Sequence, residues 1–171
     1  MFLITLAVAV LFFYGMVRFL EKTALFFPAR DIIATPRDAG LAFEDVTFTA
    51  EDGVRLHGWL MPNPAARRNL IYFHGNAGNI SNRVEKMAFY YTLGFNIFIF
   101  DYRGYGRSEG HPSEAGVYKD GRAAFDYLAS RPDVGRWPVV LYGASVGGAV
   151  AIDVATARRP AALVVEATFT N

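Results

Sequence analysis

One serine of this sequence, Ser145, has glycines two positions before and two positions after it. The pentapeptide is Gly143-Ala144-Ser145-Val146-Gly147. A Gly-x-Ser-x-Gly pattern lets a serine occupy a sharp strand-to-helix turn with its hydroxyl exposed, and side chains at the glycine positions would collide there. The flanks fit, because residues 137–142 are typical of a buried strand and residues 146–157 of a helix of small residues. The pattern indicates a nucleophilic serine that attacks a carbonyl carbon.

Two earlier segments have the pattern of an apolar strand followed by a polar loop. Residues 70–79 run from such a strand into a His-Gly loop, and residues 96–101 lead into the glycine-rich loop 102–110. In this order the three segments resemble the α/β-hydrolase superfamily. The nearest likeness is to membrane-anchored serine hydrolases described as esterases, S9/S33-like peptidases or protein depalmitoylases. The resemblance extends from Phe27 to Asn171, and its motifs are specific for the fold rather than for a substrate.

The resemblance implies that Ser145 forms an acyl-enzyme with an ester, a thioester or an amide. A serine needs a base, which in this family is a histidine oriented by an acid, in the chain order serine, acid, histidine. Two backbone N–H groups would bind the oxyanion, that of Val146 and that of Asn76 or its neighbour, each contributing about 3 kcal/mol. Asn76 also fits a simpler interpretation as a turn residue. No cofactor is implied, and the loop 102–110 is expected to form one wall of the site.

The sequence contains three histidines, and none fits the role of the base. His74 precedes the nucleophile and resembles the structural histidine of the family's His-Gly loop. His57 lies in a strand pattern and is expected to be half-buried. His111, beside Pro112, is expected to face solvent. No pair of histidines has the spacing of metal ligands, so no metal site is predicted.

The acids after Ser145 are Asp153 and Glu166, and no histidine follows it. Asp153 falls in the middle of the expected helix, and Glu166 ends the last expected strand, where we expect a structural role. The resemblance implies two more strands, with the catalytic aspartate and histidine, beyond Asn171. The sequence therefore predicts either the N-terminal portion of an active hydrolase or a short product that folds partly and is inactive. We favour the first, because residues 168–171 fall inside a familiar family segment.

The elements that must position these residues follow from the hydrophobic pattern. Residues 43–49 and 54–60 alternate apolar and polar side chains around an Asp-Gly turn, which predicts an N-terminal hairpin. Strand and helix patterns then alternate, which predicts a mostly parallel sheet with helices on both faces. Asn82 with Glu85 has the spacing of a capping box, and Gly94 can end that helix. The predicted class is α/β, an α/β-hydrolase fold that lacks its last strands.

The first twenty residues form a separate apolar segment. From Met1 to Leu20 the only charged side chain is that of Arg18. About 17 to 25 apolar residues cross a bilayer core, so we expect an uncleaved transmembrane anchor rather than a signal peptide. The expected organisation is an anchor (1–20), a linker (21–40) and a hydrolase domain (41–171). Basic residues after the apolar run favour a cytoplasmic domain, although Glu21 partly offsets them.

Composition limits the remaining function classes. Apolar residues make up 53% of the chain, and a net charge of +1 gives no electrostatic basis for binding nucleic acid. There is no cysteine, which excludes disulfides, thiolate metal ligands and a cysteine nucleophile. The expected partners are a small or lipid-like acyl substrate and a membrane. The rival interpretation is a non-catalytic, membrane-tethered binding module that keeps the hydrolase scaffold.

Overall fold

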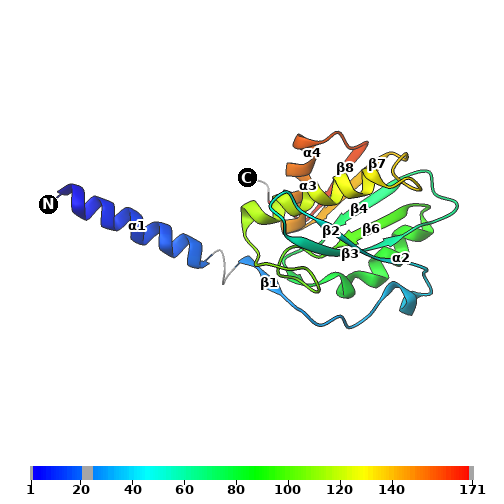
Figure 1. The fold of residues 1–171 in the computed structure, drawn as a ribbon, viewed down its shortest axis with the longest axis horizontal. Helices are drawn as coiled ribbons and strands as arrows, with labels where there is room; N and C mark the ends of the chain where they lie inside the picture. Colours follow the sequence, from blue (N-terminus) through cyan, green and yellow to red (C-terminus); the bar gives the residue numbers. More distant parts are fainter. Residues whose placement is uncertain (1, 21–24, 170–171) are drawn as a thin grey trace.

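The structure is a computed structural model that describes residues 2–20 and 25–169. It contains the N-terminal helix α1 (Phe2–Leu20) and a six-stranded sheet with helices on both faces (Figure 1). The sheet strands are β2 (Glu44–Thr49), β3 (Arg55–Met61), β4 (Asn69–Phe73), β6 (Asn96–Phe100), β7 (Val139–Ala144) and β8 (Ala162–Glu166). The further helices are α2 (Val84–Thr92), α3 (Glu114–Ser130), α4 (Val146–Ala157) and the short 3-10 turns η2 (Pro36–Ala39) and η3 (Ile80–Arg83).

The sheet is antiparallel on one side and parallel over the rest, with the strand order β2-β3-β6-β4-β7-β8. β2 and β3 form the predicted hairpin, and β3 is also antiparallel to β6. The remaining pairs, from β6 through β4 and β7 to β8, are parallel. The predicted mostly parallel sheet is therefore confirmed. Because β4 and β7 are neighbours, Phe73 at the end of β4 lies beside Gly143, which brings the His-Gly loop to the serine.

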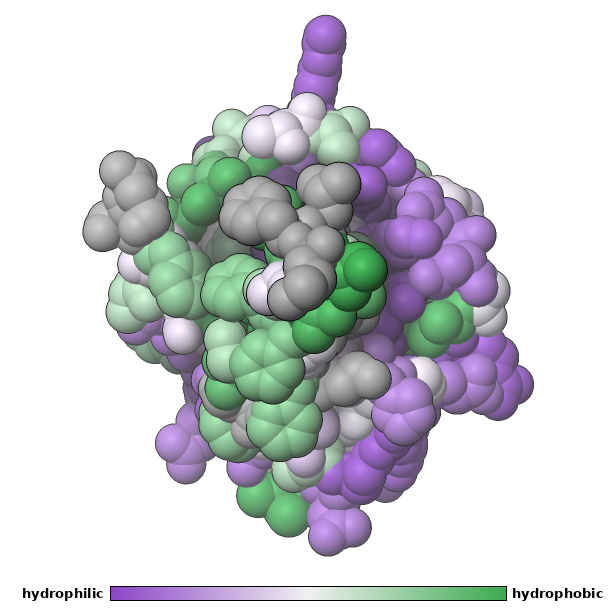
Figure 2. Space-filling view, turned by 90° about the vertical axis from the view of Figure 1, so that its left-hand side faces the viewer, coloured by the Kyte–Doolittle hydropathy of each residue, from purple (hydrophilic) through white to green (hydrophobic). Residues whose placement is uncertain are grey.

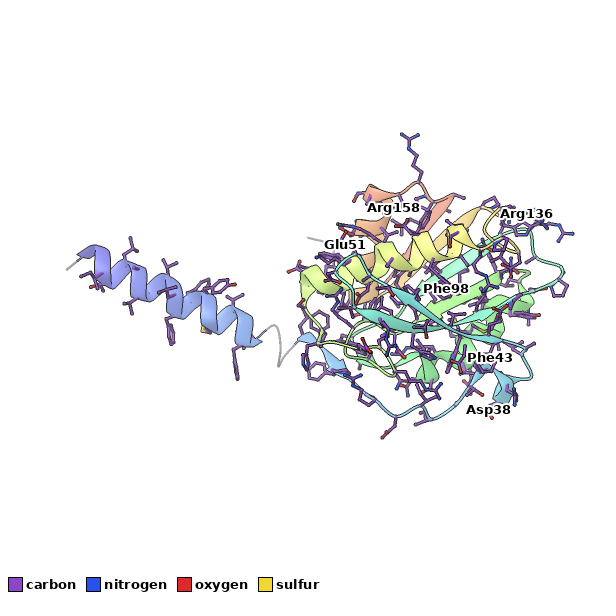
Figure 3. All side chains as sticks on the ribbon, viewed as in Figure 1. Asp38, Phe43, Glu51, Phe98, Arg136 and Arg158 are labelled. Carbon is purple, nitrogen blue, oxygen red and sulfur yellow. The ribbon has the colours of Figure 1, made fainter. Side chains whose placement is uncertain are left out.

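Each face of the sheet has its own hydrophobic core, because successive residues of a strand point to opposite faces. Phe73 of β4 and Phe98 of β6 lie in the larger core, which includes residues of α3 and α4. Phe98 is labelled below α3 in Figure 3. Tyr72 and Ile99, the neighbours of those residues, lie in the smaller core with Met87 of α2. The two cores hold the loops at the carboxyl ends of the strands on a rigid base.

The turn before α2 differs from the expected capping box. The side chain of Asn79 accepts a hydrogen bond from the Ser81 N–H, and the side chain of Asn82 accepts one from the Asn79 N–H, both at 2.9 Å. The box therefore caps η3, and the prediction that Asn82 begins a helix was wrong because η3 forms first and takes both polar side chains. Gly94 ends α2 as predicted, with a φ of 81° and its N–H on the Tyr91 carbonyl.

The chain just before the hairpin lies against the domain. β1 (Phe27–Pro28) pairs in parallel with β5 (Ala77–Gly78), directly after the His-Gly loop. The side chain of Phe26 is only 4% exposed and belongs to the larger core. Pro36, in η2, is also buried. Residues 25–40 of the expected linker therefore pack against the domain. One of their contacts, the pairing of β1 with β5, lies directly after the His-Gly loop.

The N-terminal helix is exposed. Phe12 of α1 is 73% exposed, and apolar side chains gather on the side of the molecule that carries this helix (Figure 2). Within residues 2–20 and 25–169, no helix combines the length and the apolar character that a membrane crossing needs. The transmembrane anchor expected over residues 1–20 is not supported, and membrane attachment through Met1 to Leu20 stays a prediction.

Candidate active site

Ser145 lies between the last residue of β7 and the first residue of α4, with a φ of 53° and a ψ of −122°. A positive φ is strained for any residue with a side chain, and among the described residues only Ser145 and Ala167 show it outside glycine. The serine is exposed. Its N–H donates to the Glu166 carbonyl at 2.9 Å, and its carbonyl accepts from the Gly148 N–H at 2.9 Å. The strained turn is thus fixed on both sides and presents the side chain to solvent.

The two glycines of the motif occupy positions where no side chain fits. A Cβ at Gly143 would meet the Gly147 carbonyl and would lie 2.6 Å from the Gly148 Cα. A Cβ at Gly147 would meet the Phe73 carbonyl oxygen and would lie 2.6 Å from that of His74. All of these are backbone atoms, which cannot rotate away as a side chain can. The glycines therefore let α4 approach both its own strand and the end of β4.

An open cleft of about 470 Å³ lies in front of Ser145. It is formed by the loop after β4, by α2 and by the ends of β7 and β8. Its lining residues are Tyr72, Gly75, Asn76, Ala77, Asn82, Arg83, Glu85, Lys86, Ala144, Ser145, Glu166 and Ala167. Gly75 is close to the serine, since a Cβ on it would lie 3.5 Å from the Ser145 Cβ. The loop 102–110, expected as one wall, lines none of this cleft.

Both candidate oxyanion donors lie next to the serine. The backbone N–H groups of Val146 and Asn76 make no hydrogen bond to any other residue that the structure describes. Val146 begins α4, where the positive end of the helix dipole favours a negative charge. The side-chain amide of Asn76 donates to the Leu25 carbonyl at 2.9 Å, so only its backbone N–H is available for an oxyanion. Two unpaired N–H groups beside an exposed serine can stabilise charge on a carbonyl oxygen.

None of the histidines is placed to act as the base. His74 is fully buried, its Nδ1–H donates to the Gly75 carbonyl at 2.7 Å, and burial lowers its pKa. Its Nε2 lies 3.7 Å from an Asp101 carboxylate oxygen. His57 is 7% exposed on β3, which is more buried than expected. His111 is exposed, as expected. In the described chain no cluster of three His, Cys, Asp or Glu residues could hold a metal ion.

The acids after the serine have other partners. Asp153 on α4 forms a bidentate ion pair with Arg122, at 2.8 and 2.7 Å. Glu166 lines the cleft, where its carboxylate accepts hydrogen bonds from the Lys86 ammonium and the Tyr142 hydroxyl. These two bonds lower the pKa of Glu166, the one from Lys86 most. Lys86 is not identifiable from the sequence alone, because its contact with Glu166 depends on where α2 lies over the sheet.

The chain matches known hydrolases over most of its length. Residues 64–171 match the family model of the serine aminopeptidases, S33. The protein bem46 of Schizosaccharomyces pombe is 40% identical over 162 residues, which are 88% of this chain and 54% of that protein. The α/β-hydrolase domain-containing protein WAV2 of Arabidopsis thaliana is 42% identical over 143 residues, 80% of this chain and 46% of that protein. The chain thus spans about half the length of the curated relatives it matches.

Solved structures agree with the sequence matches. The Pyrococcus furiosus esterase Pf2001 superposes with a TM-score of 0.72 and 25% identity, over 85% of this chain and 57% of the esterase chain. An α/β-hydrolase of Penicillium, GrgF, gives a TM-score of 0.65 and 28% identity, over 73% of this chain and 45% of that one. The sheet order, the turn at Ser145 and these matches have one explanation. The chain belongs to the serine aminopeptidase S33 family of the α/β-hydrolase superfamily.

Proposed function

We propose that this protein is a serine hydrolase in which Ser145 attacks an ester, a thioester or an amide. The observation that carries the proposal is the strained, exposed Ser145 beside the unpaired N–H groups of Val146 and Asn76. Its membership of the S33 family and its likeness to an esterase support the same chemistry. Without that strain and those donors, a serine at a strand-to-helix turn would be an ordinary capping residue.

In the proposed reaction the Ser145 oxygen forms a bond to the carbonyl carbon of the substrate, and its proton passes to a base. The carbonyl oxygen becomes an oxyanion held by the Val146 and Asn76 N–H groups. When the carbonyl re-forms, the bond to the alcohol, thiol or amine breaks and the leaving group takes the proton. Water then attacks the acyl-enzyme, releases the acid and restores the serine. The open cleft, which contains apolar and charged side chains, accepts a small or lipid-like acyl substrate.

Within the residues that the structure describes, no histidine bonds to Ser145, so none of them supplies the base. We infer that an acid and a histidine in the family's order complete the triad, and that the present chain alone gives no more than trace turnover. The second candidate function is a binding module on the same scaffold. It is favoured by the engagement of both Asp153 and Glu166 in ion pairs instead of in a triad.

A serine-directed fluorophosphonate and a p-nitrophenyl ester test the proposal. The assay uses a version extended with the family's acid and histidine. Ser145→Ala should lower labelling and turnover by at least about 10³-fold with an unchanged unfolding midpoint. Ser130→Ala, which changes an exposed serine bonded to the Tyr127 carbonyl, is the matched control.

Labelling that survives Ser145→Ala, or an extended version that does not react, would leave the binding module as the better explanation. The present chain gives a separate test of the missing base. Turnover by this chain that Ser145→Ala abolishes would show that it contains its own base, and His74 would then be the first histidine to replace.

A further inference from the structure

Asn76 is held by three hydrogen bonds from outside its own loop, two on its carbonyl oxygen and one on its side chain. Its carbonyl oxygen accepts from the Tyr105 hydroxyl at 2.7 Å and from the Phe27 N–H at 2.9 Å. Its side-chain amide donates to the Leu25 carbonyl at 2.9 Å. Two of the three partners belong to the chain around β1, and the third belongs to the loop after β6. None of these bonds uses the Asn76 N–H, which is the group that the proposed reaction needs.

The chain that supplies two of these bonds is itself fixed to the domain. We call residues 25–30 the strap. The Ala29 N–H donates to the Gly78 carbonyl at 3.1 Å, and the Ala29 carbonyl accepts from the Gly106 N–H at 2.9 Å. Phe26, the second residue of the strap, is 4% exposed in the larger core. The strap therefore joins the loop after β4 to the loop after β6, and the buried phenylalanine fixes its position.

We propose that the strap and Tyr105 are positioning elements for the reaction at Ser145, because they hold Asn76 through its carbonyl and its side chain and so restrict where its N–H, on the other side of the Cα, can point. This inference rests on the proposed function. A donor lowers the barrier most when it needs no reorganisation during the reaction, and a displacement of about 1 Å can cost about 100-fold in rate. The loop has glycines on both sides of Asn76, Gly75 before it and Gly78, with a φ of 80°, after it. Glycine restricts the backbone little, so the loop sequence alone does not fix Asn76.

Tyr105 is suited to this role by its surroundings. Its side chain is completely buried, and its ring packs edge-on against that of His74 with 5.3 Å between the centroids. Burial raises the pKa of the phenol, so the hydroxyl stays protonated and remains a donor throughout the working pH range. The His74 carbonyl, one residue before Gly75, accepts from the Tyr102 hydroxyl at 3.1 Å. Two buried tyrosines of one loop thus hold the carbonyls on either side of Gly75.

Two single-bond variants test the proposal. Tyr105→Phe removes the hydroxyl that holds the Asn76 carbonyl, and Asn76→Ala removes the tie to the Leu25 carbonyl, while both keep the Asn76 N–H. Tyr91→Phe is the matched control, since its hydroxyl bonds the Pro62 carbonyl at 3.3 Å at the opposite end of the sheet. Hydrogen exchange of residues 75–79 is measured on the present chain. The kcat and KM for a p-nitrophenyl ester are measured on the version extended with the acid and histidine.

We expect both variants to exchange faster at residues 75–79 and to lose about tenfold in kcat, with KM within about twofold of the wild type. The control should change neither quantity. Faster exchange with an unchanged kcat would overturn the positioning role and leave the proposed function intact. If hydrogen exchange at residues 75–79 equalled that of the wild type, the claim that these bonds hold Asn76 in place would be overturned. Equal activity of the wild type and Ser145→Ala would refute the proposed function, and the positioning role with it.

Discussion

Replacing Gly147 with valine tests whether the turn at Ser145 needs the close contact between α4 and the end of β4. A Cβ there meets the carbonyl oxygens of Phe73 and His74, the second at 2.6 Å, and both belong to the end of β4. That backbone is buried and directly continues β4, which pairs with β6 as far as Tyr72 and with β7 as far as Phe73, so we expect α4 to move instead. Overpacking of this kind costs about 1–3 kcal/mol. In a domain of this size such a loss lowers the unfolding midpoint by about 2–12 °C.

The assay is thermal unfolding of Gly147→Val beside Gly15→Val, because a Cβ at Gly15 has no atom within 4 Å. We expect the control to leave the midpoint of the domain unchanged. In the extended version Gly147→Val should also lose activity, since a shift of α4 displaces Ser145 and the Val146 N–H at its start. If Gly147→Val kept both its midpoint and its activity, the turn at Ser145 would not be a nucleophile elbow.

Two further predictions concern buried charges. Burial lowers the pKa of His57, but the nearby Asp101 carboxylate, 3.9 Å from Nδ1, and the Asp45 carboxylate, hydrogen-bonded to Nε2, outweigh it and raise the pKa above 6.5. This stabilisation is complete below about pH 6.5 and disappears as the pH rises through the folded-state pKa. The urea concentration at the unfolding midpoint should therefore fall between pH 6 and 9. In His57→Gln the midpoint should depend less on pH over the same range. Asp120, fully buried against Arg103 at 2.7 Å, should cost about 3–5 kcal/mol when changed to alanine. Asp126→Ala, which breaks an exposed pair, should cost less than about 1 kcal/mol, and equal urea midpoints for the two variants would contradict this ranking.

The features that the sequence predicted correctly are those set by short stretches of chain. The hairpin follows from the alternation of apolar and polar residues around one Asp-Gly turn, and Gly53 at that turn has a φ of 84°. The turn at Ser145 follows from the spacing of Gly143 and Gly147. A strand-to-helix turn of this shape presses backbone atoms against both positions, so it needs a glycine at each. The capping box was misplaced by three residues. Asn79 and Asn82 have the same spacing as Asn82 and Glu85, and only the folded chain shows that η3 precedes α2.

The features that could not be predicted depend on which strands are neighbours. Periodicity gives β4, β6 and β7 separately, but the order β6-β4-β7 decides that the loops after all three meet at one edge. That order brings Tyr105, from the loop after β6, onto Asn76, from the loop after β4, and Asn76 lines the same cleft as Ser145, after β7. Nothing in the local pattern around Phe27 marks it as a second donor to the Asn76 carbonyl.

The strap and Tyr105 change what the N-terminal half of this domain contributes to the proposed chemistry. Ser145 and Val146 come from one turn, which glycine spacing fixes locally. The second oxyanion donor, the Asn76 N–H, has no such local constraint. The position of Asn76 depends on hydrogen bonds from Phe27, 49 residues before it, and from Tyr105, 29 residues after it. A substitution in the strap, which lines none of the cleft, should therefore lower kcat without changing substrate affinity. If residues 25–30 were only a linker with no contact to Asn76, the same substitution would change neither kcat nor substrate affinity.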